Sequence, residues 1–382
     1  MIYVVCSLMA VFVLLQGEYH SPENDSFWGA MFTFDLFIML YLLPFRLFNE
    51  AKIKTLKLPN KQFLDYFSLI IIVLSFYSII FYSSTVRFIF SLGDLGAARD
   101  IRYVEGEFVE AGILNTIASV SAANYVFAIV LYFIYKIIGN SKTRCRLLFI
   151  SSFSNAIHVL SFVGRDGIVF WIFTFVFCYA FFRPYLQKNQ KKEIEKLFAI
   201  GGSVLLIPFF LISISRFGSS DSSGTGNSII SYLGQSFVQG PVFFGLDQKP
   251  LNLGGSFPLF KGLFNNTGMG SSRMITGEWI SWRFSTFIVS LYISLGLSGL
   301  IIFTLVMLIL FRATVGKVRN MINLGHLAVY LLYFQIIAEG VFYFCHYTRG
   351  GNLFIISTLV LSILFSTASK RGTNPIVLRK IE

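Results

Sequence analysis

The chain has 382 residues, of which 55% are hydrophobic and only 13% are charged, and its mean hydropathy is +0.70. Soluble domains carry about 25% charged residues, so this composition argues against a soluble protein. Apolar runs of about 20 residues recur along the chain and indicate a polytopic membrane protein. The four cysteines form no CxxC pair and no carboxylate-rich cluster suggests a metal, so we expect neither a metal nor another cofactor.

The apolar runs predict an all-α fold with about ten membrane-spanning helices in one domain that covers residues 1–382. The first run, Ile2–Leu15, lacks a basic segment and an A-x-A cleavage site, so we interpret it as a span rather than a removed signal peptide. The longest connections cover about 84–118 and 216–283, and the second separates the seventh span from the eighth. The predicted spans are roughly 1–15, 28–48, 64–83, 119–138, 147–163, 168–183, 197–215, 284–311, 324–344 and 352–368.

Lysine-rich connections alternate along the chain with connections that are poor in lysine. The positive-inside rule places the lysine-rich set and both termini in the cytoplasm, and the two long connections on the outer face. The net charge of +12 therefore comes mostly from lysines in the cytoplasmic connections, and nucleic acid is not expected as a partner. The basic groups are Lys52–Lys61, Lys142–Arg146, Lys188–Lys196, Arg312–Arg319 and Lys370–Lys380.

Arginine does not follow this alternation. The predicted inner side holds 13 Lys and 8 Arg, whereas the predicted outer side holds 2 Lys and 8 Arg. The outer arginines either pair with acidic neighbours such as Asp94 and Asp166, or form an anion site. We favour the anion site, because a planar guanidinium suits phosphate and carboxylate better than an ammonium does. The outer arginines are Arg87, Arg99, Arg102, Arg165, Arg216, Arg273, Arg283 and Arg349.

The ninth predicted span carries a polar stripe that ends at the outer surface. Its members have the spacing i, i+4, i+8 and i+11 and are Gln335, Glu339, Tyr343 and His346. Ionisable groups in a membrane normally face the protein interior, so Glu339 and His346 either fix helix packing or belong to a site. For Asp35 and His158, which lie in other spans, we expect a packing role.

The segment Gly164–Gly167, with the sequence GRDG, predicts a tight turn between the fifth and sixth spans, because both glycines permit positive φ. Arg165 in this turn either reaches toward the membrane surface on its own or joins the anion site. His158 and Arg165 are expected to lie in line, two helical turns apart.

Four features together resemble one family. They are the ten-span layout with a large outer connection before the last helices, the GRDG turn, an arginine at the start of the large connection in Ser215–Gly218, and the segment Arg283–Gly299. That segment reads RFSTF, then SLY, then LGLSG. The chain thereby resembles the polymerases of O-antigen and capsular repeat units (the Wzy family), which are relatives of the O-antigen ligases. The R-x10-G pattern of some members is absent, because Ser294 stands eleven residues after Arg283.

The resemblance implies a metal-independent glycosyltransferase of the bacterial cytoplasmic membrane that works at the outer leaflet. It would move a growing glycan from undecaprenyl diphosphate to the non-reducing end of a new lipid-linked repeat unit, beside a flippase and a chain-length regulator as partners. Arginines would stabilise the charge that grows on the diphosphate, and a base would deprotonate the acceptor hydroxyl.

The residue roles follow from this reaction. The predicted arginines for the diphosphate or for anionic sugar groups are Arg165, Arg216, Arg283 and Arg349, with Arg273 as a weaker candidate. The candidate bases are Glu278, Glu339 and His346, and the sequence does not rank them. Tyr343 and Trp279 are predicted to contact the substrate, and Trp279 with Trp282 is also typical of a membrane-interface anchor.

Three alternatives stay open. A flippase or exporter of lipid-linked oligosaccharides also needs arginines for a diphosphate, but it would place them in a central cavity that both sides can reach. The sequence shows neither an internal repeat nor a matching pair of broken helices, which argues against a transporter built on inverted repeats. An O-antigen ligase differs from a polymerase only in its acceptor, and a membrane scaffold would not need the outer arginines.

Overall fold

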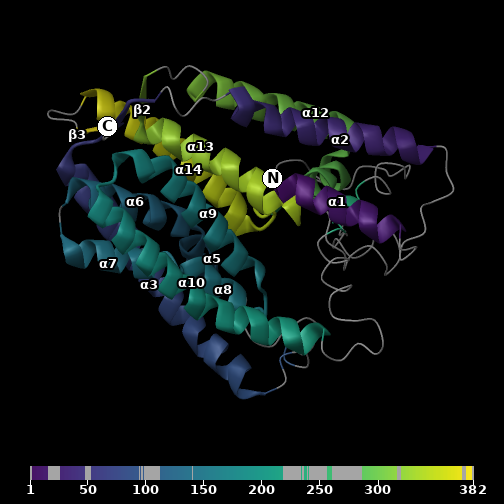
Figure 1. The fold of residues 1–382 in the computed structure, drawn as a ribbon, viewed down its shortest axis with the longest axis horizontal. Coiled ribbons are helices and arrows are strands. Elements are labelled where there is room, and N and C mark those ends of the chain that lie inside the picture. The colour runs from purple at the N-terminus through teal and green to yellow at the C-terminus, as the bar shows by residue number, and fades with distance from the viewer. Residues whose placement is uncertain are drawn as a thin grey trace. The chain divides into compact units, whose positions relative to one another are not determined.

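The computed structural model is mostly helical and contains one small sheet (Figure 1). It describes residues 2–15, 26–47, 53–93, 95, 98, 112–139, 141–217, 234, 236–238, 240, 256–259, 286–315, 320–371 and 376–380. The chain forms two compact units. Unit 1 comprises Met1–Asn49, Ser222–Val318 and His326–Val360, and unit 2 comprises Glu50–Asp221, Arg319–Gly325 and Leu361–Glu382.

Unit 1 is built on the pairing of two long helices, α2 and α12, which run side by side in Figure 1. Its core is aromatic: the ring of Tyr41 on α2 lies 4.8 Å from that of Phe287 on α12. The hydroxyl of Thr304 donates to the hydroxyl of Tyr41 at 3.1 Å, which satisfies a polar group inside this core. The helices are α1 (Ile2–Leu15), α2 (Ser26–Leu47), α12 (Phe287–Thr314), α13 (Leu324–Ala338), the 3-10 helix η4 (Glu339–Val341) and α14 (Arg349–Arg371), whose last part belongs to unit 2.

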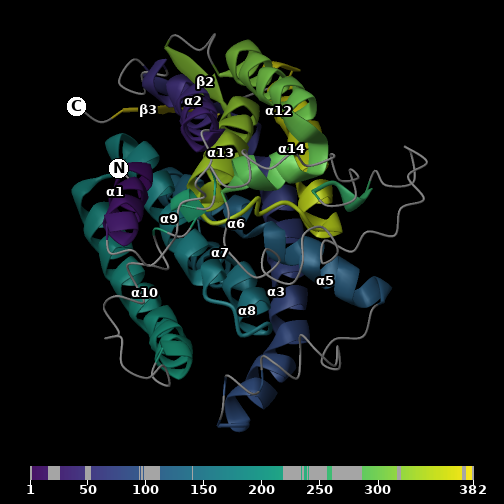
Figure 2. The same ribbon diagram turned by 90° about the vertical axis from the view of Figure 1, so that its right-hand side faces the viewer.

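Unit 2 is a bundle in which α8 packs against both α3 and α9, and α9 packs against α10 (Figure 2). The first helix of the bundle begins at a defined cap, because the side-chain oxygen of Asn60 accepts a hydrogen bond from the backbone N–H of Phe63 at 2.9 Å. The helices are α3 (Lys61–Ser91), α5 (Ile113–Ala123), α6 (Tyr125–Ile138), α7 (Lys142–Ser151), α8 (Ser154–Leu160), α9 (Asp166–Phe182), η2 (Arg183–Tyr185) and α10 (Lys188–Phe217).

A three-stranded sheet in unit 2, with strand order β2-β1-β3, was not expected from the sequence. Strand β1 (Thr55–Leu58) pairs in parallel with β2 (Met321–Asn323) and antiparallel with β3 (Ile376–Arg379). The strands come from three separate connections that the lysine pattern assigns to the same side of the membrane. The sheet brings these three connections together, which is compatible with that assignment.

Six described helices are long and apolar enough to cross a membrane, or seven if the bent pair α5–α6 forms one span. The apolar part of α2, Gly29–Phe45, and the 14-residue α1 are shorter than the 18 residues taken as the minimum for a span. Apolar side chains of α3 and α10 that point away from the bundle are exposed, among them Val73 and Ile207. These features fit an all-α multi-pass membrane protein.

Two predicted spans in unit 2 are not continuous helices. The expected span 147–163 is interrupted between α7 and α8, where the Ser152 hydroxyl donates to the carbonyl of Phe149 at 2.6 Å and accepts from the Trp171 indole at 2.9 Å. The expected span 119–138 is divided between α5 and α6 with a bend of 41° at Asn124, whose amide donates to the carbonyl of Val120. Polar side chains that bond to nearby backbone carbonyls bend or end helices in this way.

The lysine-rich segment 188–196, which was predicted to connect two spans, is helical. It forms the first turns of α10, which continues without interruption from Lys188 to Phe217. Lysine and glutamate are good helix formers, so charge alone did not mark the end of a helix here.

Candidate functional site

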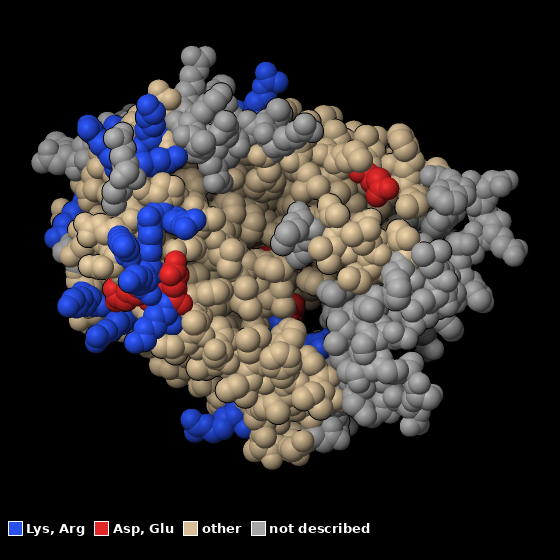
Figure 3. Space-filling model, viewed as in Figure 1, with Lys and Arg blue, Asp and Glu red and all other residues tan. Residues whose placement is uncertain are grey.

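The described lysines of unit 2 gather at one end of its helices. The start of α3 joins the end of α6, because the Tyr135 hydroxyl donates to Asp65 at 2.6 Å. The end of α6 joins the start of α10 through an ion pair between Lys136 and Glu193 at 2.5 Å. In Figure 3 most Lys and Arg side chains of the face shown lie together on the left, near the position of α7 in Figure 1, beside a few acidic side chains. We call this the lysine end of unit 2.

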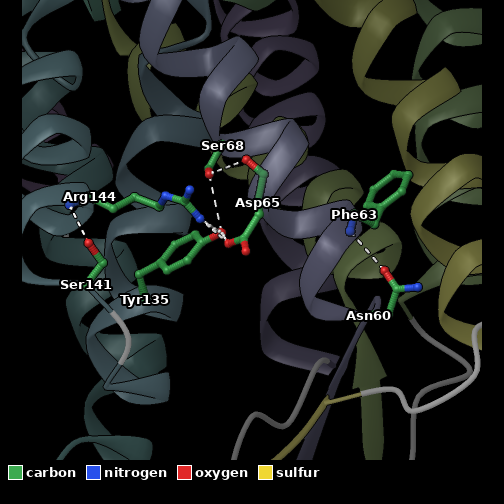
Figure 4. Close-up of polar contacts among 7 residues, drawn as sticks. All are labelled: Asn60, Phe63, Asp65, Ser68, Tyr135, Ser141 and Arg144. Carbon is green, nitrogen blue, oxygen red and sulfur yellow. Dashed lines mark hydrogen bonds and ion pairs between the residues drawn. The ribbon is translucent and has the colours of Figure 1, made fainter.

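A polar cluster at the lysine end holds three helices together (Figure 4). Arg144 on α7 forms an ion pair with Asp65 on α3, and its guanidinium carbon lies 5.3 Å from the ring centroid of Tyr135 on α6. The hydroxyl of Ser68 lies 3.3 Å from that of Tyr135. Both charged side chains are 30% exposed, so the pair contributes roughly 1 kcal/mol or less. The cluster fixes helix packing and contains none of the predicted site residues.

Arg165 lies at the opposite end of unit 2. It directly precedes α9, which has 17 residues and therefore separates it by roughly 25 Å from the lysine end. The side chain is only 7% exposed. Its Nη1 atom donates to the Ser213 hydroxyl at 2.8 Å, and its guanidinium carbon lies 5.8 Å from the ring centroid of Phe209. Arg165 is therefore fixed against the last turns of α10 and does not reach out on its own.

The glycines around Arg165 serve a different purpose from the one expected. In the turn between α8 and α9 the residue with positive φ is Val163, at 54°, and neither Gly164 nor Gly167 has positive φ. Both glycines are instead required by close approach. A Cβ on Gly164 would lie 2.5 Å from Cγ1 of Val159. A Cβ on Gly167 would lie 2.7 Å from the Cβ of the same valine. The two glycines let the start of α9 pack tightly onto α8.

The expected alignment of His158 with Arg165 on one helix is also wrong, because α8 ends at Leu160 and Val163 interrupts the path. The His158 ring lies 4.6 Å from that of Tyr82 and 5.1 Å from that of Phe162, which agrees with the packing role expected for it.

Two further arginines lie at the same end of unit 2 as Arg165. Arg216 belongs to the last turn of α10, three residues after Ser213, and its side chain lies outside the described residues. Arg87 lies in the last turns of α3 and is exposed. The described part of unit 2 thus has lysine at one end of α3, α9 and α10 and arginine without lysine at the other.

Glu339 and Gln335 form a buried pair in unit 1. They are 3% and 2% exposed, and the Gln335 amide donates to Oε1 of Glu339 at 3.2 Å. The expected polar stripe stops there, because α13 ends at Ala338 and a 3-10 turn follows. Close packing sets this turn: a Cβ on Gly340 would lie 2.7 Å from the ring of Phe287. Glu339 therefore lies beside the start of α12.

His346 lies beyond the end of the helix, in the connection between η4 and α14, and is 5% exposed. Its ring stacks on Phe354 at 5.5 Å and meets Phe344 edge-on at 6.0 Å. Its Nε2 atom is buried and has no hydrogen-bond partner among the described residues. Burial lowers the pKa of His346 to about 4, so the imidazole is neutral near pH 7 and Nε2 can accept or donate a hydrogen bond.

The expected span 284–311 is broken. Gly296, inside α12, has φ 69° and ψ 179°, a conformation that is essentially restricted to glycine. Hydroxyl groups gather at this break: that of Ser294 donates to the carbonyl of Ser290 at 2.9 Å and lies 2.6 Å from that of Ser256. Sequence reasoning missed Ser256, although the i, i+4 pair Ser290 and Ser294 was visible in an apolar run.

The remaining predicted residues divide as follows. Arg349 is the first residue of α14 and is exposed, and the Tyr343 ring packs on Tyr347 at 5.9 Å. Arg273, Glu278, Trp279 and Arg283 lie outside the described residues. Arg165 and Arg216 belong to unit 2, whereas Glu339, Tyr343, His346 and Arg349 belong to unit 1.

Among the residues that the structure describes, no group of three or more His, Cys, Asp or Glu side chains could hold a metal ion. The chain matches no protein-family model, no curated protein and no solved structure.

Proposed function

We propose that the chain is a membrane glycosyltransferase that joins oligosaccharide repeat units carried on undecaprenyl diphosphate. In this proposal about ten spans cross a bacterial cytoplasmic membrane, and both termini and the lysine end of unit 2 lie in the cytoplasm. The connection 216–283 and the residues around Arg165 lie at the outer leaflet. The family resemblance motivates the reaction, and one structural observation supports the side on which it takes place.

That observation is the fixed position of Arg165. A buried arginine that serves only to mark topology has no reason to lie at the end opposite the lysines. Arg165 is held by Ser213 and Phe209 on α10, and Arg216 follows in the last turn of that helix. A guanidinium held in one place suits a diphosphate, because its planar fork then meets the phosphate oxygens without reorganisation.

The chemistry needs an anion site and a base. A hydroxyl oxygen of the acceptor sugar attacks the anomeric carbon of the donor glycan, and the bond between that carbon and the diphosphate breaks. The negative charge passes to the diphosphate, where arginines stabilise it. The hydroxyl proton passes to a base. Glu339 and His346 are the described candidates, and His346 is already in the neutral form that a base requires.

The break in α12 keeps one alternative open. Broken helices bind substrates and ions in several transporter folds, so a flippase of lipid-linked oligosaccharides remains the second candidate. The two functions differ in the product that accumulates when the gene is deleted. Loss of the polysaccharide ladder with a single capped repeat remaining supports a polymerase, whereas loss of capped repeats altogether supports a flippase or a ligase.

Replacement of Arg165 tests the proposed anion site directly. We expect Arg165→Ala and Arg165→Lys to abolish the ladder at normal protein levels in the membrane, because lysine keeps the charge but not the planar fork. The matched control is Arg146→Ala, which removes an exposed arginine at the lysine end and should leave the ladder unchanged. A normal ladder in both Arg165 variants would overturn the proposal.

A further inference from the structure

Asn352 is a buried polar residue near the start of α14 that no sequence pattern pointed to. It is 1% exposed and uses its whole side-chain amide. Its Nδ2 atom donates to the carbonyl of His346 at 2.7 Å and to that of Ser256 at 3.1 Å, and its Oδ1 atom accepts from the N–H of Leu259 at 3.3 Å. One side chain therefore joins α14, the connection that carries His346, and the segment Ser256–Leu259.

The backbone around Asn352 is shaped for this contact. The N–H of Gly351 donates to the Thr348 hydroxyl at 3.0 Å, which caps the first turn of α14. A Cβ on Gly351 would lie 2.6 Å from Cα of His346. Only glycine lets α14 approach the His346 backbone so closely, and this approach brings the Asn352 amide within reach of the His346 carbonyl.

The segment Ser256–Leu259 is one of the described parts of the long connection 216–283. Besides its bonds to Asn352, it is held at the α12 break, where the Ser256 hydroxyl donates to the carbonyl of Ser290 at 3.1 Å. Its Phe257 ring lies 5.7 Å from Phe344, the ring that meets His346 edge-on. The segment thus backs Phe344, one of the two rings that pack on the imidazole.

We propose that Asn352 is a positioning residue that docks the segment Ser256–Leu259 onto the His346 connection and thereby holds the His346 imidazole buried with Nε2 free for an acceptor hydroxyl. This inference rests on the proposed function, because it assigns His346 rather than Glu339 to the acceptor. Asn352 itself touches only backbone groups and acts through the position of His346.

The surroundings of His346 agree with this role. Aromatic rings pack on it from the segment before it and from α14, through Phe344 and Phe354. Within unit 1, the charged residues of the adjoining elements η4 and α14 are Glu339, which is bonded to Gln335, and Arg349, which is exposed at the start of α14. Burial is the cause of the lowered pKa of His346, so a loosened Ser256–Leu259 segment admits water and raises it.

The test is a pH titration of His346 by NMR in detergent-solubilised protein with isotope-labelled histidine, where His346→Gln identifies the signal among the four histidines. Two variants distinguish the hydrogen bonds donated by Nδ2 of Asn352 from the one accepted by its Oδ1. Asn352→Ala removes every bond, whereas Asn352→Asp keeps an acceptor for Leu259 and loses the donor to both carbonyls. The control is Asn124→Ala, which removes a single bond to the nearby carbonyl of Val120.

We expect the pKa of His346 to rise by at least about one unit toward the ordinary 6.5 in both Asn352 variants and to stay unchanged in Asn124→Ala. Ladder synthesis should fall at least about tenfold in both Asn352 variants, because His346 is then no longer held in position as the base. An unchanged His346 pKa in both variants overturns the positioning role. A raised pKa with a normal ladder supports the docking by Asn352 but overturns the proposed use of His346.

Discussion

Arg165 and Ser213 are joined by a hydrogen bond of 2.8 Å between Nη1 and Oγ, although 48 residues separate them in sequence. The bond ties the turn before α9 to the end of α10, and the guanidinium also lies over Phe209, one turn earlier on that helix. The contact makes the position of a buried cation depend on two helices.

Ser213→Ala removes this contact while Arg165 stays in place. A hydrogen bond to a charged group contributes about 1.5–3 kcal/mol, so the free energy of unfolding should fall by this amount. The measurement is chemical or thermal unfolding in detergent, followed by tryptophan fluorescence. Ser203→Ala, at an exposed position of the same helix, is the control and should change stability by less than about 0.5 kcal/mol. Equal effects of the two variants would contradict the role of Ser213.

The turn glycines give a prediction that separates steric crowding from backbone strain. Gly164→Ala and Gly167→Ala should each destabilise the protein by about 1–3 kcal/mol, because each new methyl group overlaps Val159. Val159→Ala should rescue Gly164→Ala in part, since the closest clash there is with Cγ1 of Val159. It should not rescue Gly167→Ala, whose methyl group still meets the Cβ at position 159 and the carbonyl of Asn155.

Unfolding of the double variants in the same detergent measures these couplings as a double-mutant cycle. If Val159→Ala does not restore Gly164→Ala even in part, overlap with Cγ1 of Val159 is not the cause of the destabilisation, and this steric interpretation of Gly164 is wrong.

Hydropathy was a reliable guide to the existence of the helices and a poor guide to their continuity. The runs around α3, α9 and α14 were placed correctly because each contains a long stretch of mostly apolar residues, which is visible in the sequence. The interruptions at Ser152 and Gly296 depend on a tertiary bond to Trp171 and on a glycine conformation. Serine and glycine are also common in continuous membrane helices, so neither residue type predicts an interruption of the helix.

The candidate site shows the same limit. Arg165, Glu339 and His346 were found as ionisable residues in apolar surroundings, which is a strong signal in any membrane segment. Asn352 and Ser256 were missed because single neutral polar residues are frequent, and only the fold brings them together from positions 96 residues apart. Three short strands escaped notice because their pairing depends on segments far apart in the chain.

Gly296→Ala tests whether the break in α12 is required. The φ of 69° and ψ of 179° are accessible almost only to glycine, and placing alanine there is expected to cost about 1–3 kcal/mol. The control is Gly202→Ala on α10, where a Cβ meets nothing within 4 Å, so that this change should be neutral or stabilise by up to about 1 kcal/mol. If Gly296→Ala also proves neutral in unfolding measurements, α12 does not need the break.

The cluster at the lysine end predicts a difference between two ion pairs. The coupling energy between Asp65→Asn and Arg144→Gln should be near 1 kcal/mol, because Tyr135 and Ser68 order that pair and both charges are 30% exposed. The coupling between Lys136→Gln and Glu193→Gln should stay below about 0.5 kcal/mol, because Glu193 is 57% exposed. Unfolding at low and at high salt checks this, and the Asp65 pair should be the less sensitive of the two.

His346 predicts how stability depends on pH. Burial lowers its pKa from 6.5 to about 4, so between these values the unfolded chain binds a proton that the folded chain does not. The contribution of this group to the free energy of unfolding is therefore complete above about pH 6.5 and is lost as the pH falls toward about 4. His346→Gln has no such group. The stability of the wild type relative to this variant should then decline between pH 7 and pH 4.5, by about 1.4 kcal/mol for each pH unit well inside the window. Parallel curves for the two proteins over this range would mean that His346 is not buried in its neutral form, and would remove the basis for assigning it the acceptor proton.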